Sequence, residues 1–270
     1  LTALPNGKAR TQQLEQFQQR LASLRFLDPA CGSGNFLTYT YMELRRMENK
    51  VLYELNSLGY QLPENPILVS ISQVHGFEIN DFAVDTAKTA LWIAQNQMLH
   101  ETFAIIGNSL PELPLSNIDT IHCVNALTTK WETLADPQKI NYIVGNPPFV
   151  GARLQTEEQK AEVFNIFGKD WENVIDLDYV CCWYKLAVDF MKQNPKIKCA
   201  LVSTNSICQG EQVANLWKPL FEAGLVINYA YTTFRWESDS NGMAHVHCVI
   251  VGFALEADEK KFLFNAEGVV

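Results

Sequence analysis

Apolar residues along the chain follow two spacings, one typical of helices and one typical of short buried strands. Helical spacing extends over residues 8–22, where Leu14, Phe17 and Leu21 share one face, and it returns in four later segments. The predicted helices are 8–22, 35–58, 82–99, 179–191 and 213–221. Short apolar runs bounded by turn residues predict strands at 24–27, 71–77, 118–124, 140–144, 199–203, 226–232 and 246–253.

The alternation of these strands with helices predicts parallel βαβ units joined by right-handed crossovers. The last two strands are separated only by residues 235–242, which leave no room for a helix, so they are predicted to form an antiparallel hairpin at one edge. The expected fold is α/β, a doubly wound, mostly parallel sheet of about seven strands.

Composition adds limits to this picture. With 270 residues, 47% of them hydrophobic, the chain can bury a full core, and no stretch is apolar enough to span a membrane. Residues 1–30 lack the pattern of a signal peptide, and the first residue is Leu1. We therefore expect a segment of a longer cytoplasmic protein. The seven cysteines are odd in number and form no C-x-x-C pair, which favours buried thiols.

A glycine-rich stretch, Asp28-Pro29-Ala30-Cys31-Gly32-Ser33-Gly34-Asn35-Phe36, follows the first predicted strand. Gly32 and Gly34 allow a tight turn and a close approach of the backbone to a ligand at a helix N-terminus. The third glycine of a dinucleotide-binding loop is missing, which argues against a pyrophosphate ligand. Asp28, at the end of the strand, is placed to hold an ammonium or hydroxyl group.

The second predicted strand ends in Phe77-Glu78-Ile79-Asn80. An acidic residue at the end of this strand, after a glycine loop on the first, is placed to accept both hydroxyls of a ribose. The alternative is a helix-capping role, which Asn80 or Asp81 could fill without Glu78.

The loop Asn146-Pro147-Pro148-Phe149 follows the fourth predicted strand. The exocyclic amine of adenine is a weak nucleophile because its lone pair is delocalised into the ring. If the Asn146 side-chain oxygen and the Pro147 carbonyl each accept one N–H, the lone pair is freed and aimed, and the two prolines hold that carbonyl in place. Phe149 could stack on the base. The alternative is an ordinary Pro-Pro turn.

These three motifs, in this order, resemble the amino-methylating DNA adenine methyltransferases, and most closely the methyltransferase core of single-chain restriction–modification enzymes. The resemblance covers residues from about 20 to 255. It implies a class I methyltransferase fold and S-adenosylmethionine as cofactor. It also implies double-stranded DNA as substrate, with the target adenine flipped out of the helix.

Carried over position by position, the resemblance implies a role for each matching residue. Glu78 would bind the cofactor ribose and Asn125 with Ala126 its adenine, although many relatives carry Asp where this chain has Asn125, and Ile79 would be a further cofactor-binding residue. Asp178 and Tyr179 would border the methionine moiety and the target base, while Phe234 or Trp236, in the loop between the last two strands, could pack on that base and Arg235 could reach phosphate. The remaining cofactor residues would be Asp28, Pro29, Ala30, Gly32, Gly34 and Phe36.

The resemblance also suggests a domain plan. Residues 1–22 would be a helix leading in from an upstream region, 23–256 the catalytic domain, and 257–270 the start of a connection to a target-recognition domain. No Asp…Glu-x-Lys nuclease pattern is convincing here, so the nuclease and recognition regions are expected elsewhere on the same polypeptide. Residues 151–172 form a long polar connection, a candidate lid or DNA-facing segment.

The net charge of −9 stands against a DNA substrate, since phosphate contacts need basic side chains. Either a basic cleft is concentrated locally, or most of the DNA grip lies outside this chain, and we favour the second. Two alternatives therefore stay open: a methyltransferase of a protein glutamine or an RNA base, and a non-catalytic module with the same fold.

Three further features receive no catalytic role. His245 and His247 fall on the same side of a strand but have no evident third ligand, so no metal is expected. Cys181 and Cys182, beside apolar neighbours on a helix, are expected to be buried. Residues 203–206 could equally contact substrate or serve local hydrogen bonding.

Overall fold

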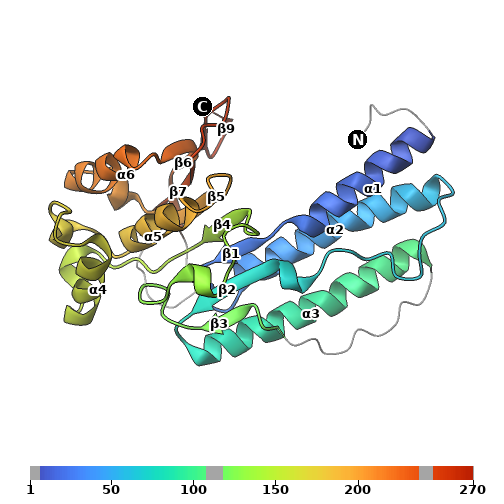
Figure 1. The fold of residues 1–270 in the computed structure, drawn as a ribbon, viewed down its shortest axis with the longest axis horizontal. Helices are drawn as coiled ribbons and strands as arrows, with labels where there is room; N and C mark the ends of the chain where they lie inside the picture. The colour runs from blue at the N-terminus through green and yellow to red at the C-terminus, as the bar shows by residue number, and fades with distance from the viewer. Residues whose placement is uncertain (1–6, 108–117, 237–245, 270) are drawn as a thin grey trace. The chain divides into compact units, whose positions relative to one another are not determined.

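The computed structural model describes residues 7–107, 118–236 and 246–269 (Figure 1). The chain divides into two compact units. The first comprises residues 1–26 and 31–123, and the second comprises residues 27–30 and 124–270. None of the helices in the described ranges is both long enough and apolar enough to cross a membrane.

The first unit is a helical layer on a short pair of parallel strands. Its central helix packs against the two others, and their apolar faces enclose a core that includes Leu37, Leu91 and Met98 (Figure 1). Strand β2 pairs in parallel with β3, with Glu78 opposite Cys123. The elements are α1 (Lys8–Ser23), α2 (Asn35–Ser57), η1 (Ile71–Gln73), β2 (Val74–Glu78), α3 (Asp81–Ile106) and β3 (Ile121–Cys123).

Polar groups are also buried in the first unit. Arg45 is paired with Glu48 and donates to the Thr102 hydroxyl at 2.6 Å, while Glu48 accepts from Gln18 at 2.8 Å. Buried charges are tolerated only when they are paired and hydrogen-bonded, and these contacts tie α1, α2 and α3 together.

The second unit contains most of the sheet, in the order β1-β4-β5-β7-β6-β8-β9. Strands β4 and β5 are parallel, β7 is antiparallel to both β5 and β6, β8 is parallel to β6, and β9 is antiparallel to β8. The strands are β1 (Phe26–Asp28), β4 (Tyr142–Gly145), β5 (Lys198–Thr204), β6 (Val226–Trp236), β7 (Val246–Ala254), β8 (Phe262–Asn265) and β9 (Gly268–Val269).

The helices of the second unit are short. The α-helices are α4 (Glu157–Phe167), α5 (Cys181–Met191) and α6 (Lys218–Glu222), and a π-helix, η6 (Val213–Trp217), precedes α6. Pro219 lies in the first turn of α6, where its missing N–H is tolerated. The 3-10 turns are η2 (Trp131–Thr133), η3 (Ala152–Leu154), η4 (Val174–Asp176) and η5 (Asn205–Cys208).

The predicted α/β class and the antiparallel β6–β7 pair are confirmed, and three details were wrong. The pair is not at an edge, because β8 and β9 continue the sheet beyond β6. The predicted loop 151–172 contains α4, which begins with a Thr156–Gln159 capping box. Residues 71–73 form a 3-10 turn rather than the start of a strand, because Ser70 and Gln73 make a second capping box there.

The cysteines are only partly as predicted. Cys181 and Cys182 are fully buried, and burial raises the pKa of both thiols well above the ordinary value. Cys123 and Cys208 are exposed, which contradicts uniform burial.

Candidate active site

In the first unit, the glycine loop uses both of its glycines for conformations that side chains resist. Gly32 has φ +53° and Gly34 has φ +82°, in the left-handed region. Gly34 also caps α2, and a Cβ there would lie 2.8 Å from the Ala87 Cβ of α3. The loop therefore lies directly against α3, and Phe36, one residue into α2, keeps 38% of its surface exposed.

Glu78 is held by the backbone on both of its oxygens. Gly32 N donates to Oε2 at 2.9 Å, and Asn80 N donates to Oε1 at 2.9 Å. The structure thus brings the glycine loop and the end of β2 together through this carboxylate. Asn80 caps α3 by accepting from Ala83 N. Glu78 is therefore not needed as the helix cap, and its carboxylate binds the glycine loop instead. Ile79 beside it is 68% exposed.

In the second unit, Asp28 ends β1 and is only 1% exposed. Its Oδ1 accepts from Ala30 N at 3.0 Å, which sets the turn into the glycine loop. A Cβ at position 145 would lie 2.8 Å from the same oxygen, so glycine is needed where β4 passes Asp28. The Pro29 carbonyl accepts from the indole of Trp183 at 3.1 Å, which ties this turn to α5.

The Asn146–Phe149 loop leaves β4 directly after Gly145. Within the described part of the chain, the Asn146 Oδ1 atom is shielded from solvent and accepts no hydrogen bond. Pro147 is buried, Pro148 exposed and Phe149 half-buried. Leaving a buried acceptor unsatisfied costs about 1–3 kcal/mol, so a ligand that donates a hydrogen bond to this amide would be favoured.

The loop is anchored to the segment before α5. Tyr179 N donates to the Val150 carbonyl at 2.9 Å, and Gln155 Nε2 donates to the Leu177 carbonyl at 2.9 Å. Asp178 is buried and accepts from the hydroxyls of Thr204 at 3.2 Å and Ser206 at 3.3 Å. The hydroxyls of Thr204, at the end of β5, and Ser206, just after it, thus serve local hydrogen bonding in this structure.

Glu162 of α4, which the sequence did not single out, joins two predicted site residues. Its Oε1 accepts from Asn125 Nδ2 at 2.6 Å, and its Oε2 accepts from the Tyr179 hydroxyl. Burial raises the pKa of the Tyr179 phenol far above its ordinary value, and the hydrogen bond to Glu162 and the charge of that residue raise it further. The other end of the Asn125 amide accepts from Leu127 N at 2.8 Å, and the Ala126 carbonyl accepts from Trp131.

The prediction that the aromatic residues near the end of β6 lie in a loop was wrong. Phe234 and Trp236 lie on the strand, opposite Cys248 and Val246 of β7, rather than in a loop. Phe234 is half-buried and Arg235 is exposed. The structure does not describe the side chain of Trp236 or residues 237–245, and the latter include the predicted His245. The strand continues further than expected because pairing with β7 resumes at Phe234 after an irregularity between Tyr231 and Phe234.

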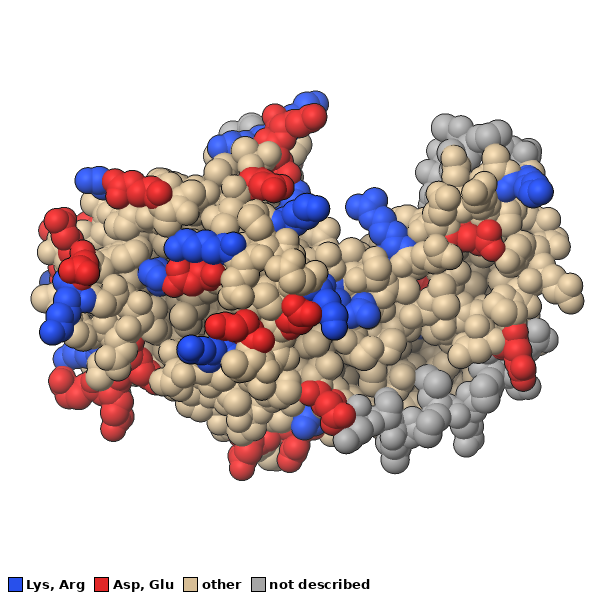
Figure 2. Space-filling model, viewed as in Figure 1, with Lys and Arg blue, Asp and Glu red and all other residues tan. Residues whose placement is uncertain are grey.

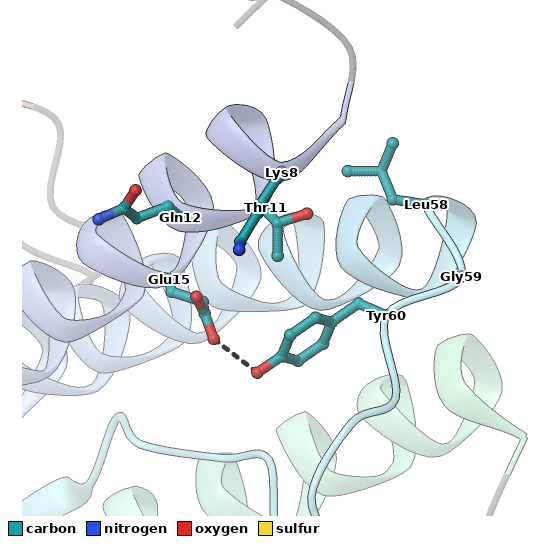
Figure 3. Close-up of a pocket in the computed structure, with 7 residues that line it drawn as sticks. All are labelled: Lys8, Thr11, Gln12, Glu15, Leu58, Gly59 and Tyr60. Carbon is teal, nitrogen blue, oxygen red and sulfur yellow. Dashed lines mark hydrogen bonds between the residues drawn. The ribbon is translucent and has the colours of Figure 1, made fainter.

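A separate cavity of about 630 Å³ lies between the start of α1 and the end of α2 (Figure 3). The Tyr60 hydroxyl donates to Glu15 Oε1 at 2.5 Å within it. No predicted site residue is among the side chains that line it, which are Lys8, Thr11, Gln12, Glu15, Leu58 and Tyr60, with Gly59.

The surface shows how the charges are distributed. On the face drawn in Figure 2, among the coloured residues, Lys and Arg are interspersed with Asp and Glu rather than gathered into one continuous field. Among the described residues, several basic side chains are paired with acidic ones, for example Lys185 with Asp189 and Lys198 with Asp258. This face therefore does not offer the basic stripe that would grip a phosphate backbone unaided.

The fold and the two loops define an enzyme of the class I methyltransferase type, and comparison with known proteins identifies the family. The chain belongs to the family described as MmeI, DNA-methyltransferase domain, which matches residues 4–265. The predicted family and fold are thereby confirmed.

Two relatives are identical to this chain at about two-fifths of the aligned residues. DNA methyltransferase A of Bacillus subtilis (strain 168) is 42% identical over 258 residues, covering 94% of this chain and 29% of the relative. The Type IIL restriction-modification enzyme MmeI, solved in complex with DNA, is 41% identical with a TM-score of 0.90, covering 96% of this chain and 35% of that one. The chain thus spans about a third of the length of these relatives.

More distant structures share the fold alone. The M protein of the Type I restriction enzyme EcoKI is 14% identical with a TM-score of 0.51, over 92% of this chain and 47% of that one.

Proposed function

We propose that this chain is the catalytic core of a DNA methyltransferase that moves a methyl group from S-adenosylmethionine to the N6 amine of a flipped adenine. The observation that carries the proposal is the Oδ1 atom of Asn146, which is buried and has no hydrogen-bond partner among the described residues, in a loop restricted by two prolines. The family match supplies the substrate class, because the matching family is one of DNA methyltransferases.

At the target base, Asn146 Oδ1 would accept one N–H of the adenine amine and the Pro147 carbonyl the other. This pair of acceptors restores nucleophilic character to the nitrogen lone pair and orients it. Phe149 would stack on the base, a contact worth about 1–3 kcal/mol. Because Oδ1 is now shielded from solvent, the incoming base must displace the groups that cover it. Tyr179, with Phe234 or Trp236, would line the base further.

The residues assigned to the cofactor fit it chemically. A carboxylate offers about four acceptor sites, and the backbone N–H groups of Gly32 and Asn80 occupy two of those on Glu78, one on each oxygen, so two ribose hydroxyls can still be accepted. Asn125 Oδ1 likewise keeps a lone pair for the adenine amine, beside Ala126. Ile79 is exposed for packing on that adenine. The rest of the cofactor would be held by Asp28, Pro29, Ala30, Gly32, Gly34 and Phe36. When bound, S-adenosylmethionine supplies an electrophilic methyl group on a sulfonium.

The proposal extends to the whole protein. Residues 23–256 would be the catalytic domain in a cytoplasmic restriction–modification enzyme. Residues 1–22 and 257–270 would lead to nuclease and target-recognition regions on the same polypeptide. The intermixed charges of Figure 2 agree with a DNA grip that lies largely in those regions.

The test is modified-base sequencing of genomic DNA from a host that expresses the full-length gene, beside a host that expresses its Asn146→Ala variant. Methyladenine at one short motif in the first host alone is the expected result. If a soluble full-length protein binds S-adenosylmethionine but leaves DNA unmodified, labelled cofactor with ribosomal extract tests the protein or RNA alternative. No shift of the melting temperature with S-adenosylmethionine would favour a non-catalytic module.

A further inference from the structure

Glu162 lies at the centre of a three-residue arrangement wholly inside the second unit. Its carboxylate receives hydrogen bonds from Asn125, just after β3, and from Tyr179, just before α5. Three segments that are well separated in the sequence therefore meet at one half-buried side chain of α4. Hydrogen bonds to an ionised carboxylate are roughly twice as strong as neutral ones, so this arrangement can fix both partners.

The direction of the Asn125 amide follows from this contact. An ionised carboxylate can only accept hydrogen bonds, so the amide must turn its NH₂ group toward Glu162. The carbonyl oxygen then points the other way, where it accepts from Leu127 N and has one lone pair left. Without Glu162, the Leu127 N–H would hold the oxygen side of the amide alone, and the NH₂ side would lose its charged acceptor.

The same contact explains why asparagine, not aspartate, suits position 125 in this chain. An aspartate oxygen in place of Nδ2 would lie at hydrogen-bond distance, 2.6 Å, from Glu162 Oε1. Two carboxylates so close cannot both be ionised without strong repulsion. The other titratable groups facing Glu162 are the phenol of Tyr179 and the thiol of Cys182, and the raised pKa of each keeps it protonated.

We propose that Glu162 is a positioning residue that orients the Asn125 amide so that its oxygen faces the adenine amine of the cofactor, with Tyr179 held by the same carboxylate. The inference rests on the proposed function, because it assumes that Asn125 meets the cofactor. It makes Asn125 and Glu162 a matched pair in which either residue restricts what the other can be.

The test is the affinity of the full-length protein for S-adenosylmethionine, measured by titration calorimetry in a compensating pair of variants. Asn125→Asp should weaken binding at least about tenfold, because a close carboxylate pair disrupts the site. Adding Glu162→Gln to that variant should restore most of the lost affinity, because the glutamine NH₂ can donate to the new aspartate. Glu158→Gln, on the exposed side of α4, is the matched control and should restore nothing.

A second measurement separates positioning from a general structural effect. In Asn125→Asp, affinity should rise as the pH falls from about 8 to about 6, because the carboxylate pair can then share a proton. The unaltered protein should show no such rise.

Unchanged affinity in Asn125→Asp, or failure of Glu162→Gln to restore it, overturns the inference while leaving the proposed function intact. Absence of S-adenosylmethionine binding in the unaltered protein overturns the proposed function itself and this inference with it.

Discussion

Glu78 in the first unit and Asn146 in the second are both predicted ligand-binding side chains, yet their hydrogen bonding differs. Both oxygens of Glu78 already accept backbone N–H groups, from Gly32 and Asn80. The Asn146 oxygen is buried and accepts none within the described residues. The first side chain therefore contributes to folding, whereas the second leaves a buried acceptor unsatisfied among the described residues, a cost to stability that a bound ligand would offset.

The largest effect is expected at Asn146, whose buried Oδ1 atom has no partner among the described residues. Asn146→Ala should lower kcat for methyl transfer by at least about 100-fold, comparable to removing one preorganised polar group from an active site. The melting temperature should stay the same or rise, because an unsatisfied buried oxygen is removed. Single-turnover transfer of labelled methyl groups and thermal unfolding measure the two quantities.

Asn96→Ala on the exposed side of α3 is the control for a loss of an asparagine alone. A marked drop in melting temperature for Asn146→Ala, with transfer reduced only in proportion, would mean that this amide is structural and that the contrast with Glu78 does not hold.

Glu78→Gln is expected to have the next largest effect, and it should lower both the unfolding free energy and the affinity for the cofactor. Glutamine has a single acceptor oxygen, so it leaves either Gly32 N or Asn80 N without its present partner. Loss of a charge-assisted hydrogen bond should cost about 2 kcal/mol, divided between unfolding free energy and cofactor affinity. Urea unfolding and calorimetric titration with S-adenosylmethionine check this, with exposed Glu64→Gln as the matched control. Weaker cofactor binding at full stability would show that Glu78 resembles Asn146 after all.

The predictability of the two regions from sequence differs for physical reasons. The glycine loop and Glu78 follow short apolar strands and consist of residues whose conformational needs are local, such as the positive φ of Gly34. Their places were therefore predictable, and the long helices α2 and α3 were predictable from apolar spacing alone. The hydrogen bond from Gly32 to Glu78 was not predictable, because it depends on how β2 lies beside the loop.

In the second unit, more features were not predicted from the sequence. Helix α4 is polar, with Val163 and Phe167 as its buried residues, so apolar spacing gave little indication of it. The Thr156–Gln159 capping box was the available signal and was missed. Glu162 could not have been selected from sequence, because one glutamate in a charged segment gains meaning only from Asn125 and Tyr179, which lie far from it along the chain.

The smallest expected effect concerns a second unpartnered atom, Nδ1 of His75 in β2, which also lacks a hydrogen bond within the described residues. Burial, followed by the nearby Arg25 and His122, lowers the pKa of His75 to about 4. The unfolded chain titrates near 6.5, so between these values it binds a proton that the folded protein does not. Stability is therefore full above about pH 7 and falls as the pH drops toward 4, by about 1 kcal/mol between pH 7.5 and pH 5.5.

His75→Phe should flatten this slope in urea unfolding while methyl transfer at neutral pH stays near normal, because no predicted role falls on His75. That outcome sharpens the contrast: both atoms are buried and lack a partner among the described residues, yet the one on Asn146 would serve catalysis and the one on His75 would affect stability alone. A large loss of transfer in His75→Phe at unchanged stability would break the contrast, since it would place chemistry on a strand residue that follows no motif.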